Sequence, residues 1–372
     1  MTVPNHSDTY QQIYDSISVF PCAPENKKSV IPDDKLGFGK NFTSHMFITT
    51  YKDGKWNDPK IVPYGPLEMS PCAKVLHYGQ SCFEGMKAYP NSDGACTLFR
   101  PYDNAQRFNL SCSRLIMPEV DEDLFVAACQ KLITVDAEYI PKSPGTAMYL
   151  RPTCIGGSMN DALGLNPSEE YTFFIILSPV GPYFAAGFNP VKILVESHYV
   201  RAAPGGTGDR KVCGNYASSL LAARSAAKQG YQQVLWLDAV HHKYLEEVGA
   251  MNLFVVIDNK VITAPLSGTI LPGITRRSVI QLAKDLGYEV EERLISIDEV
   301  VEAHKAGTLH EAFGSGTAAA IAPVGLLGHE GKDYEINNFE VGSITKQLYD
   351  TLVGIQTGVA EDKHGWRYTF KV

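Results

Sequence analysis

The densest chemical signal in the sequence is a glycine-rich run around one lysine. Residues 203–216 read Ala-Pro-Gly-Gly-Thr-Gly-Asp-Arg-Lys-Val-Cys-Gly-Asn-Tyr, and such glycines let the backbone approach a ligand closely. The run is not a P-loop, because the required spacing is absent and Val212 follows the lysine where a hydroxyl is needed. A partly desolvated lysine beside a tight turn can form a Schiff base. Lys211 is therefore a candidate catalytic amine; the alternative is a solvated loop lysine.

A second signal is a pair of adjacent carboxylates, Glu246 and Glu247, which precede a glycine and an apolar strand. Successive side chains of an extended segment face opposite ways, so one of the two can be buried. A buried carboxylate needs a cationic partner. The pyridinium nitrogen of pyridoxal phosphate (PLP) is such a cation, and a carboxylate there keeps it protonated. The alternative is two solvated turn residues.

Two loops have the composition of anion-binding turns. Residues 265–278 form a loop that runs into an expected helix with Pro272 near its first turn, and free amides at a helix N-terminus attract phosphate. A similar arrangement is expected at residues 314–320, where Thr317 offers an amide and a hydroxyl. Together they predict a phosphorylated ligand, although each alone can be a capped helix. Residues 314–319 also echo the dinucleotide fingerprint, but no regular βαβ unit surrounds them.

The N-terminal half contains a candidate substrate face. Tyr149 and Arg151 alternate on an expected strand, so both side chains lie on the same face. An arginine beside a tyrosine is well suited to a carboxylate-bearing substrate. The alternative is a structural ion pair.

Composition narrows the class of protein. The chain has 372 residues, 44% of them hydrophobic and 20% charged, and a formal net charge of -8, which predicts two globular domains and argues against a general nucleic-acid binder. The eight cysteines include no C-x-x-C pair and no zinc-ligand spacing, so we expect reduced thiols and no metal. The first twenty residues lack the pattern of a signal or transit peptide, and no apolar run is long enough for a membrane, so a cytoplasmic protein is expected.

The order of expected elements indicates an α+β (mixed α/β) fold of two domains. We expect a smaller N-terminal domain with an extended arm over 1–178, a linker over the Pro- and Gly-rich residues 179–190, and a larger C-terminal domain over 191–372. The expected strands are 45–51, a segment near Ile61, 147–151, 171–177, 191–196, 233–237 and 252–257. The expected helices are 101–115, 121–138 with Asp121 as N-cap, 215–229, 272–286, 297–306 and 336–353.

Six segments, in order along the chain, resemble the branched-chain aminotransferases, which are fold-type-IV PLP enzymes. They are Phe83-Glu-Gly-Met-Lys-Ala, Gly205-Gly-Thr-Gly-Asp, Gly214-Asn-Tyr, Glu247-Val-Gly, Leu271-Pro-Gly-Ile-Thr-Arg and Gly314-Ser-Gly-Thr-Ala. The resemblance runs from about Phe38 to the C-terminus. Any one motif is weak, but six in the same order are specific.

The resemblance implies a role for each candidate residue and an active site at the domain interface. Lys211 would be the Schiff-base lysine, and the other cofactor-binding residues would be Arg107, Tyr216, Glu247, Thr269, Ile270 and Thr317. The substrate-binding residues would be Tyr78, Phe83, Tyr149, Arg151, Leu163, Leu165, Tyr183 and Ala318. A homodimer is also implied, in which Leu163 and Leu165 reach the neighbouring subunit's site.

The sequence departs from the family pattern at two places. Ala250 stands where the eukaryotic members have a threonine after Glu-Val-Gly, so a side-chain hydroxyl is absent. Ala319 and Ala322 occupy the positions of the redox C-x-x-C pair of animal members. No thiol switch of that type is therefore expected.

The implied reaction is a reversible, ping-pong transfer of the amino group of L-leucine, L-isoleucine or L-valine to 2-oxoglutarate through a Lys211–PLP aldimine. The same cofactor also serves D-amino-acid aminotransferases and aminodeoxychorismate lyases, whose chains are shorter. A PLP-binding protein without turnover is a further alternative. A nicotinamide-dependent oxidoreductase is the alternative from a different class.

Overall fold

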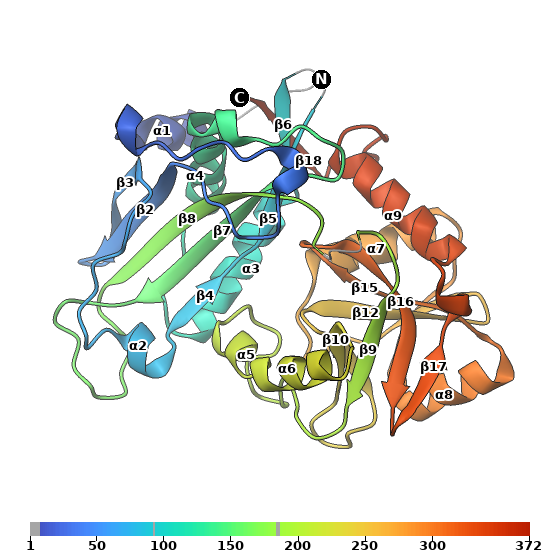
Figure 1. Cartoon of the computed structure of the whole chain (residues 1–372). Helices are drawn as coiled ribbons and strands as arrows, with labels where there is room; N and C mark the ends of the chain where they lie inside the picture. Colours follow the sequence, from blue (N-terminus) through green and yellow to red (C-terminus); the bar gives the residue numbers. More distant parts are fainter. Residues whose placement is uncertain (1–7, 92–93, 184–186) are drawn as a thin grey trace. The chain divides into compact units, whose positions relative to one another are not determined.

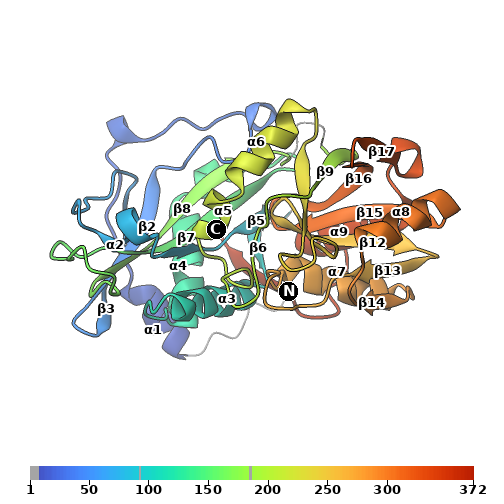
Figure 2. The ribbon, with the colours of Figure 1, turned by 90° about the horizontal axis from the view of Figure 1, so that it is seen from below.

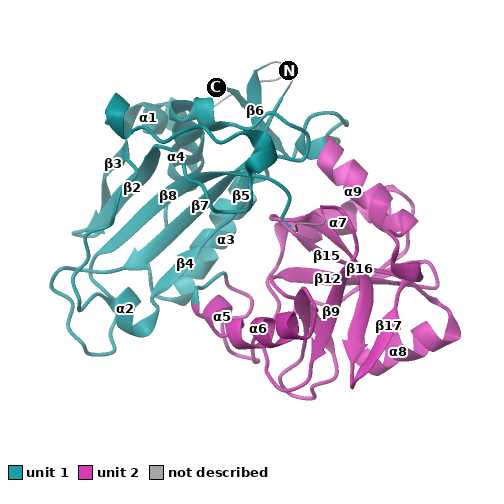
Figure 3. Cartoon of the chain, viewed as in Figure 1, with its two compact units in different colours: residues 1–183, 211–213, 355–372 teal, residues 184–210, 214–354 magenta. Residues whose placement is uncertain are grey.

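The structure is a computed structural model that describes residues 8–91, 94–183 and 187–372 (Figures 1 and 2). The chain divides into two compact units, coloured separately in Figure 3. Unit 1 comprises Met1–Tyr183, Lys211–Cys213 and Ile355–Val372, and unit 2 comprises Phe184–Arg210 and Gly214–Gly354. The chain therefore leaves unit 1, returns to it for three residues that include the candidate lysine, and returns again at its C-terminal end.

Unit 1 is a mainly antiparallel sheet with helices against it. Its strands are β1 (Ser18–Val19), β2 (His45–Lys52), β3 (Lys55–Pro63), β4 (Ser81–Phe83), β5 (Met86–Pro90), β6 (Ala95–Phe99), β7 (Ala147–Gly156), β8 (Tyr171–Val180) and β18 (Arg367–Lys371). Its helices are α1 (Asp8–Ser16), α2 (Lys74–Tyr78), α3 (Pro101–Arg114) and α4 (Glu122–Val135), with the 3-10 turns η1 (Pro24–Asn26), η2 (Asp33–Lys35) and η3 (Ala137–Tyr139). The strand order is β1-β3-β2-β8-β7-β5-β6-β18, and β4 pairs with β7.

Helices cover one face of this sheet. In Figure 2, α1, α3 and α4 lie on the same side of β7 and β8. The fully buried rings of Phe108, Phe125 and Phe173 meet there, with ring centroids 5.3–5.8 Å apart, and such aromatic contacts stabilise the core beyond simple burial. The Asp121 carboxylate accepts a hydrogen bond from the Leu124 amide, as its predicted N-cap role requires.

Unit 2 is a second mixed sheet. Its strands are β9 (Val191–Glu196), β10 (Gln233–Leu237), β11 (Leu245–Val248), β12 (Met251–Ile257), β13 (Lys260–Thr263), β14 (Val290–Glu292), β15 (Leu309–Gly316), β16 (Ala320–His329) and β17 (Lys332–Glu335). Its helices are α5 (Gly214–Ala217), α6 (Leu220–Lys228), α7 (Ile274–Asp285), α8 (Ile297–Ala306) and α9 (Ser343–Gln356), with the 3-10 turn η4 (Asn337–Phe339). The C-terminal end of α9 already belongs to unit 1.

The sheet of unit 2 closes on itself. Its order is β11-β10-β9-β16-β15-β12-β13-β14, and β11 pairs with β12 as well as with β10. The strands β11, β10, β9, β16, β15 and β12 therefore form a ring. A closed ring of strands removes exposed sheet edges, and it fixes the short strand β11 between two partners.

Most predicted elements are confirmed, and several boundaries differ. The strands over 191–196 and 233–237 and the helix over 297–306 have the predicted bounds. The predicted helix 215–229 is split into α5 and α6, and the predicted helix 336–353 begins only at Ser343, after the turn η4. The N-terminal part of unit 1, expected to be an extended arm, contains the helix α1, which was not predicted.

The predicted linker over 179–190 is described only in part, since residues 184–186 lie outside the described residues. Its first residues, Pro179 and Val180, still belong to β8. Among the helices of the described part of the chain, none has the length and apolar character needed to cross a membrane.

Candidate active site

Lys211 is held in unit 1 by backbone contacts on both sides. The Lys211 amide donates a hydrogen bond of 2.9 Å to Ser111 Oγ, and the Phe83 amide donates one of 3.1 Å to the Lys211 carbonyl. Val212, the next residue, forms a bridge with Cys82 of β4. These contacts fix the start of the lysine side chain, whose Nζ lies 4.9 Å from the centroid of the Phe83 ring.

The same phenylalanine ring contacts an arginine. The guanidinium carbon of Arg151 lies 4.5 Å from the Phe83 ring centroid, and Arg151 Nη2 donates a 3.1 Å hydrogen bond to the Tyr149 hydroxyl. The Nε atom of Arg151 is buried and has no hydrogen-bond partner among the described residues. The predicted same-face arrangement of Tyr149 and Arg151 is confirmed, and it places a cation with unused hydrogen-bonding capacity over an apolar ring.

A glycine is required next to this group. A Cβ atom added to Gly85 would lie 2.1 Å from the Tyr149 hydroxyl, a distance at which the atoms overlap. The glycine of the Phe83-Glu-Gly motif therefore makes room for the Tyr149 side chain.

Arg107 is buried on α3 and forms a two-point ion pair. Its Nε and Nη2 atoms donate to the two carboxylate oxygens of Glu84 at 2.7 and 2.8 Å, and the Glu84 side chain is 0% exposed. A bidentate pair of this kind sets the plane of the guanidinium. Ser111 Oγ, which accepts from the Lys211 amide, itself donates to the Arg107 carbonyl at 3.0 Å. Lys211 and Arg107 are thus linked through one hydroxyl.

The remaining substrate candidates of unit 1 differ in exposure. Tyr183 contacts Phe38 edge-on at 5.0 Å, Phe38 contacts Tyr149 in the same way, and burial raises the pKa of the Tyr183 phenol. Tyr78 ends α2, and its hydroxyl donates to the Leu163 carbonyl. The side chains of Leu163 and Leu165 are 63% and 80% exposed. The two leucines therefore lie on the surface of their own chain.

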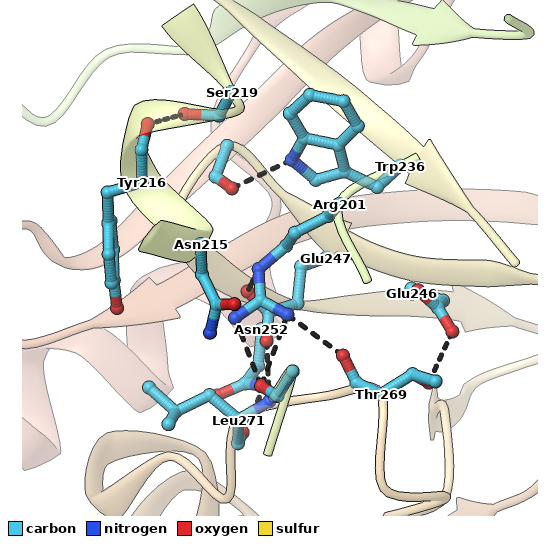
Figure 4. Close-up of polar contacts among 12 residues, drawn as sticks. Arg201, Asn215, Tyr216, Ser219, Trp236, Glu246, Glu247, Asn252, Thr269 and Leu271 are labelled. Carbon is cyan, nitrogen blue, oxygen red and sulfur yellow. Dashed lines mark hydrogen bonds and ion pairs between the residues drawn. The ribbon is translucent and has the colours of Figure 1, made fainter. Parts of the chain in front are cut away.

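In unit 2, Glu247 lies at the centre of a buried polar network, drawn in Figure 4. Its Oε2 lies 2.9 Å from Nε of Arg201, and its Oε1 accepts a 2.7 Å hydrogen bond from the Leu271 amide. Both charged side chains are at most 4% exposed. The guanidinium and the amide both favour the ionised carboxyl group, so Glu247 is a buried carboxylate of fixed orientation.

The loop that precedes α7 is tied to the same network (Figure 4). Arg201 Nη1 donates 2.8 Å to the Thr269 carbonyl, and Asn252 Nδ2 donates 2.9 Å to the Leu271 carbonyl. Thr269 Oγ1 donates 2.5 Å to Oε1 of Glu246. Thr269 and Ile270 are each 3% exposed. The loop's backbone conformation is therefore set by buried side chains from outside it.

Both adjacent carboxylates are buried, although the sequence predicted one. Glu246 and Glu247 are 5% and 2% exposed. They face opposite ways along β11, as predicted, but β11 lies inside a closed ring of strands. A strand within such a ring can therefore bury both of its faces.

The other candidates of unit 2 lie on turns and a short helix. Tyr216 is half-buried on α5, and its ring lies beside the Asn215 side chain in Figure 4. Thr317 and Ala318 lie in the turn between β15 and β16. The prediction of a helix N-terminus at residues 314–320 is wrong, because that turn joins two strands. Gly316, the last residue of β15 before the turn, lies near Ala250: a Cβ added there would be 3.9 Å from the Ala250 carbonyl oxygen.

Two important residues were missed in the sequence. Arg201 lies two positions before the glycine-rich run, and nothing in its local sequence marks it as the partner of Glu247. Glu84 lies within a motif that was singled out, but its bond to Arg107 spans 23 positions. Only Glu84 had a detectable signal, since a carboxylate between Phe83 and Gly85 in a buried segment requires a cation.

These residues fit pyridoxal phosphate. Within unit 1 there are a primary amine, Lys211, and a buried guanidinium, Arg107. Within unit 2, taken by itself, there are a buried carboxylate, Glu247, and the amides of a fixed loop before α7. The Ser315 hydroxyl, in cross-strand register with Asn252 and through it with Glu247, is buried without a partner among the described residues, so a polar atom remains for a ligand. Amine, pyridinium partner and anion-binding groups are the chemistry that this cofactor needs.

Comparisons with known proteins identify the family. Residues 81–327 match the model of the amino-transferase class IV family. A probable branched-chain-amino-acid aminotransferase of Staphylococcus aureus (strain N315) is 54% identical over 335 residues, which cover 90% of this chain and 93% of that protein. The crystal structure of the Escherichia coli branched-chain amino acid aminotransferase superposes with a TM-score of 0.72 at 31% identity, over 86% of this chain and 98% of that one. The T.th. branched-chain amino acid aminotransferase, complexed with N-(5'-phosphopyridoxyl)-L-glutamate, gives a TM-score of 0.70 at 26% identity, over 90% and 98%.

The family model covers more than half of the chain, and the identity with the staphylococcal protein extends over nine-tenths of it. The mixed α/β fold agrees with the fold-type-IV structures to which it is similar. The chain therefore belongs to the class IV aminotransferases, which are PLP-dependent enzymes, and within them to the branched-chain-amino-acid aminotransferases.

Proposed function

We propose that this enzyme transfers the amino group of L-leucine, L-isoleucine or L-valine to 2-oxoglutarate, with Lys211 as its catalytic residue. The observation that carries the proposal is the group around Phe83. That ring is shared by the Lys211 amine at 4.9 Å and the Arg151 guanidinium at 4.5 Å. An apolar wall with one cation beside the reacting amine suits both an aliphatic side chain and a carboxylate.

The two substrates would contact different groups of the same apolar wall and its arginine. A leucine side chain would pack on Phe83, Tyr149 and the neighbouring aromatic rings. The side-chain carboxylate of glutamate would accept from Arg151, whose Nε is buried without a partner among the described residues. In support, the related T.th. enzyme was crystallised with a phosphopyridoxyl derivative of L-glutamate, a ligand that carries a second carboxylate.

Lys211 would move the proton of the reaction. PLP, when bound, supplies an electron sink for the negative charge that develops at the substrate α-carbon. The Nζ atom of Lys211 would take the proton from that carbon as a general base and, as an ammonium group, would deliver it to the cofactor carbon that carried the aldehyde. The Phe83 ring, whose centroid lies 4.9 Å from Nζ, forms an apolar wall beside the reacting amine. The Glu247 carboxylate, kept ionised by Arg201, would accept a hydrogen bond from the pyridinium nitrogen.

A separate set of residues would hold the phosphate and the ring of the cofactor. Arg107, the amides of Thr269 and Ile270, and Thr317 are the proposed phosphate ligands. The Tyr216 hydroxyl would donate to the phenolic oxygen of PLP, and the Ala318 amide would meet the substrate α-carboxylate.

We also propose that the enzyme works as a homodimer in the cytoplasm. Leu163 and Leu165 are exposed on a loop that the Tyr78 hydroxyl and the Lys74 ammonium hold through its carbonyl groups. Large apolar side chains held on a fixed, exposed loop are typical of an interface with another protein. Leu163, Leu165 and Tyr183 would thereby help to close the substrate pocket.

The proposed reaction is tested with a panel of amino donors. We expect formation of L-glutamate from 2-oxoglutarate with L-leucine, L-isoleucine and L-valine, and loss of the visible absorbance of the bound cofactor when L-leucine alone is added. Turnover of D-alanine or of aminodeoxychorismate in place of L-leucine would instead indicate one of the related activities. A protein that is yellow but does not change with L-leucine would contradict the proposal.

Replacing Arg151 should separate the two substrates. For Arg151→Met we expect KM for 2-oxoglutarate to rise about 100-fold, because a charge-assisted hydrogen bond to a carboxylate is worth about 1.5–3 kcal/mol and the buried carboxylate then lacks a partner. The kcat/KM for L-leucine in the half-reaction should change less than about fivefold, because its side chain needs no cation. Single-turnover absorbance changes with each substrate measure both values.

Arg151→Lys and the surface variant Arg224→Met are the matched controls. Arg224 is exposed on α6, so its replacement should leave both values unchanged. Arg151→Lys keeps the charge but loses the planar fork, and an intermediate KM for 2-oxoglutarate is expected. Equal losses for both substrates in Arg151→Met would show that Arg151 is a structural residue.

A further inference from the structure

Glu246 is a buried acid for which the proposed reaction has no use. It is 5% exposed and adjoins the carboxylate Glu247, yet it faces the opposite side of β11. Its Oε2 atom has no hydrogen-bond partner among the described residues. On that side Glu246 lines a narrow pocket whose other walls are mainly apolar, with Thr263 as the one further polar residue among the described residues of its lining. In such surroundings the ionised form of a carboxyl group has a high free energy, and the protonated, neutral form is favoured.

Its other oxygen is the end of a chain of hydroxyl groups. Ser267 Oγ and Thr269 Oγ1 lie 2.9 Å apart, and Thr269 Oγ1 donates to Glu246 Oε1 at 2.5 Å. Because the Thr269 hydroxyl has one hydrogen and gives it to Glu246, Ser267 is the donor in its contact with Thr269. The carboxyl group thus orients two side chains of the loop that precedes α7. Figure 4 shows the contact between Glu246 and Thr269.

We infer that Glu246 is a positioning residue for the cofactor phosphate: its neutral carboxyl group holds the Thr269 hydroxyl and, through it, the loop whose amides bind phosphate. The inference rests on the proposed roles of Thr269 and Ile270. Glu246 itself would touch neither the cofactor nor the substrate. Through its carboxyl group, the affinity for the cofactor would depend on pH.

The charges around Glu246 set the direction of that dependence. Burial, the largest cause, raises the pKa of Glu246 to about 7, the neighbouring Glu247 and Asp238 raise it further, and the Thr269 hydroxyl and Arg201 lower it. Arg276 of α7 donates to the carbonyl of Ala264, a residue that also lines the pocket, but pairs with Glu292. Below pH 7 the carboxyl group is neutral. Above it, a negative charge appears behind the loop that binds a phosphate dianion, and we expect binding to weaken.

The decisive experiment measures the dissociation constant of PLP from the apoenzyme, by absorbance titration, between pH 6 and pH 8.5. The wild type and Glu246→Gln should bind PLP with similar affinity at pH 6, since both side chains are neutral and both accept from Thr269. The ratio of the wild-type to the variant dissociation constant should rise about tenfold by pH 8.5, because only the wild type acquires the charge. Titration of PLP itself cancels in this ratio.

Pyridoxal, which lacks the phosphate, tests whether the charge of Glu246 weakens binding through the phosphate group. With pyridoxal in place of PLP, the ratio should stay constant from pH 6 to pH 8.5. Glu246→Leu removes the acceptor of Thr269 and should weaken PLP binding about tenfold at every pH. Glu340→Gln, a change of the same type at an exposed position, should follow the wild type throughout.

Parallel pH profiles of the wild type and Glu246→Gln would overturn the inference, as would an equal pH effect on pyridoxal. The comparison of those two proteins suffices even if Glu246→Leu does not fold. In either case tight PLP binding by the wild type would leave the proposed function intact. An apoenzyme that binds no PLP at any pH would instead overturn the proposed function and this inference with it.

Discussion

Lys211→Ala is expected to lower kcat for transfer between L-leucine and 2-oxoglutarate by about 10⁴-fold or more. The substitution removes both the amine that bonds covalently to the cofactor and the general base at the α-carbon, and general base catalysis alone contributes about 10²–10⁴-fold. The backbone contacts of residue 211 with Ser111 and Phe83 do not involve the side chain. The variant should therefore fold and still bind PLP non-covalently.

Borohydride reduction provides the second measurement for this variant. In the wild type, mass spectrometry should find the reduced cofactor on the peptide that contains residue 211, and in Lys211→Ala on no peptide. Lys228→Ala, an exposed lysine of α6, is the matched control and should retain full activity and labelling. Normal transfer by Lys211→Ala, or labelling at another lysine, would refute the assignment of the catalytic amine.

The sequence was sufficient to predict the local elements that carry this lysine and its surroundings. The residues of β9 alternate in burial, and those of β10 are apolar after Gln233, over lengths typical of strands. The helix α8 follows its N-cap Ser296, whose hydroxyl accepts a hydrogen bond from the Glu299 amide, so local rules suffice for these elements. Tyr149 and Arg151 lie on one face simply because they are two residues apart on a strand.

Local sequence rules could not predict which distant strands pair with each other. The strand β18 pairs with β6 across more than 260 positions, and β11 is enclosed because it pairs with both β10 and β12. Neither pairing leaves a periodic trace in the local sequence. For the same reason the burial of both Glu246 and Glu247, and the ion pair of Arg201 with Glu247, became visible only in three dimensions.

The predicted start of the helix over 336–353 and the predicted helix N-terminus at residues 314–320 were wrong for a different reason. In both cases the sequence contained residues compatible with a helix, but in the folded protein these residues form turns. Ala320 has a positive φ of 58° at the start of β16, and that reversal directs the chain back antiparallel to β15. A run of three alanines has high helix propensity, but pairing between β15 and β16 over Gly316–Ala320 overrides it.

Glu247→Ala should destabilise the apoenzyme by about 3–5 kcal/mol and also lower kcat by about 10²–10³-fold. The loss of stability arises because Arg201, 4% exposed, is left as a buried cation without its carboxylate, and the Leu271 amide loses its acceptor. The loss of rate arises because no carboxylate then stabilises the protonated pyridine. Urea denaturation of the apoenzyme measures stability without the contribution of bound PLP.

The double variant Arg201→Met/Glu247→Leu separates these two effects. Removing both charges leaves no unpaired ion, so much of the lost stability should return, as for buried ion pairs replaced by apolar residues of similar volume. The recovery should be incomplete, because Arg201 also donates to the carbonyl groups of Gly208 and Thr269. The rate should stay as low as in Glu247→Ala, since the carboxylate is still absent. Recovery of both stability and rate would show that Glu247 only neutralises Arg201, and its proposed contact with the cofactor would then be wrong.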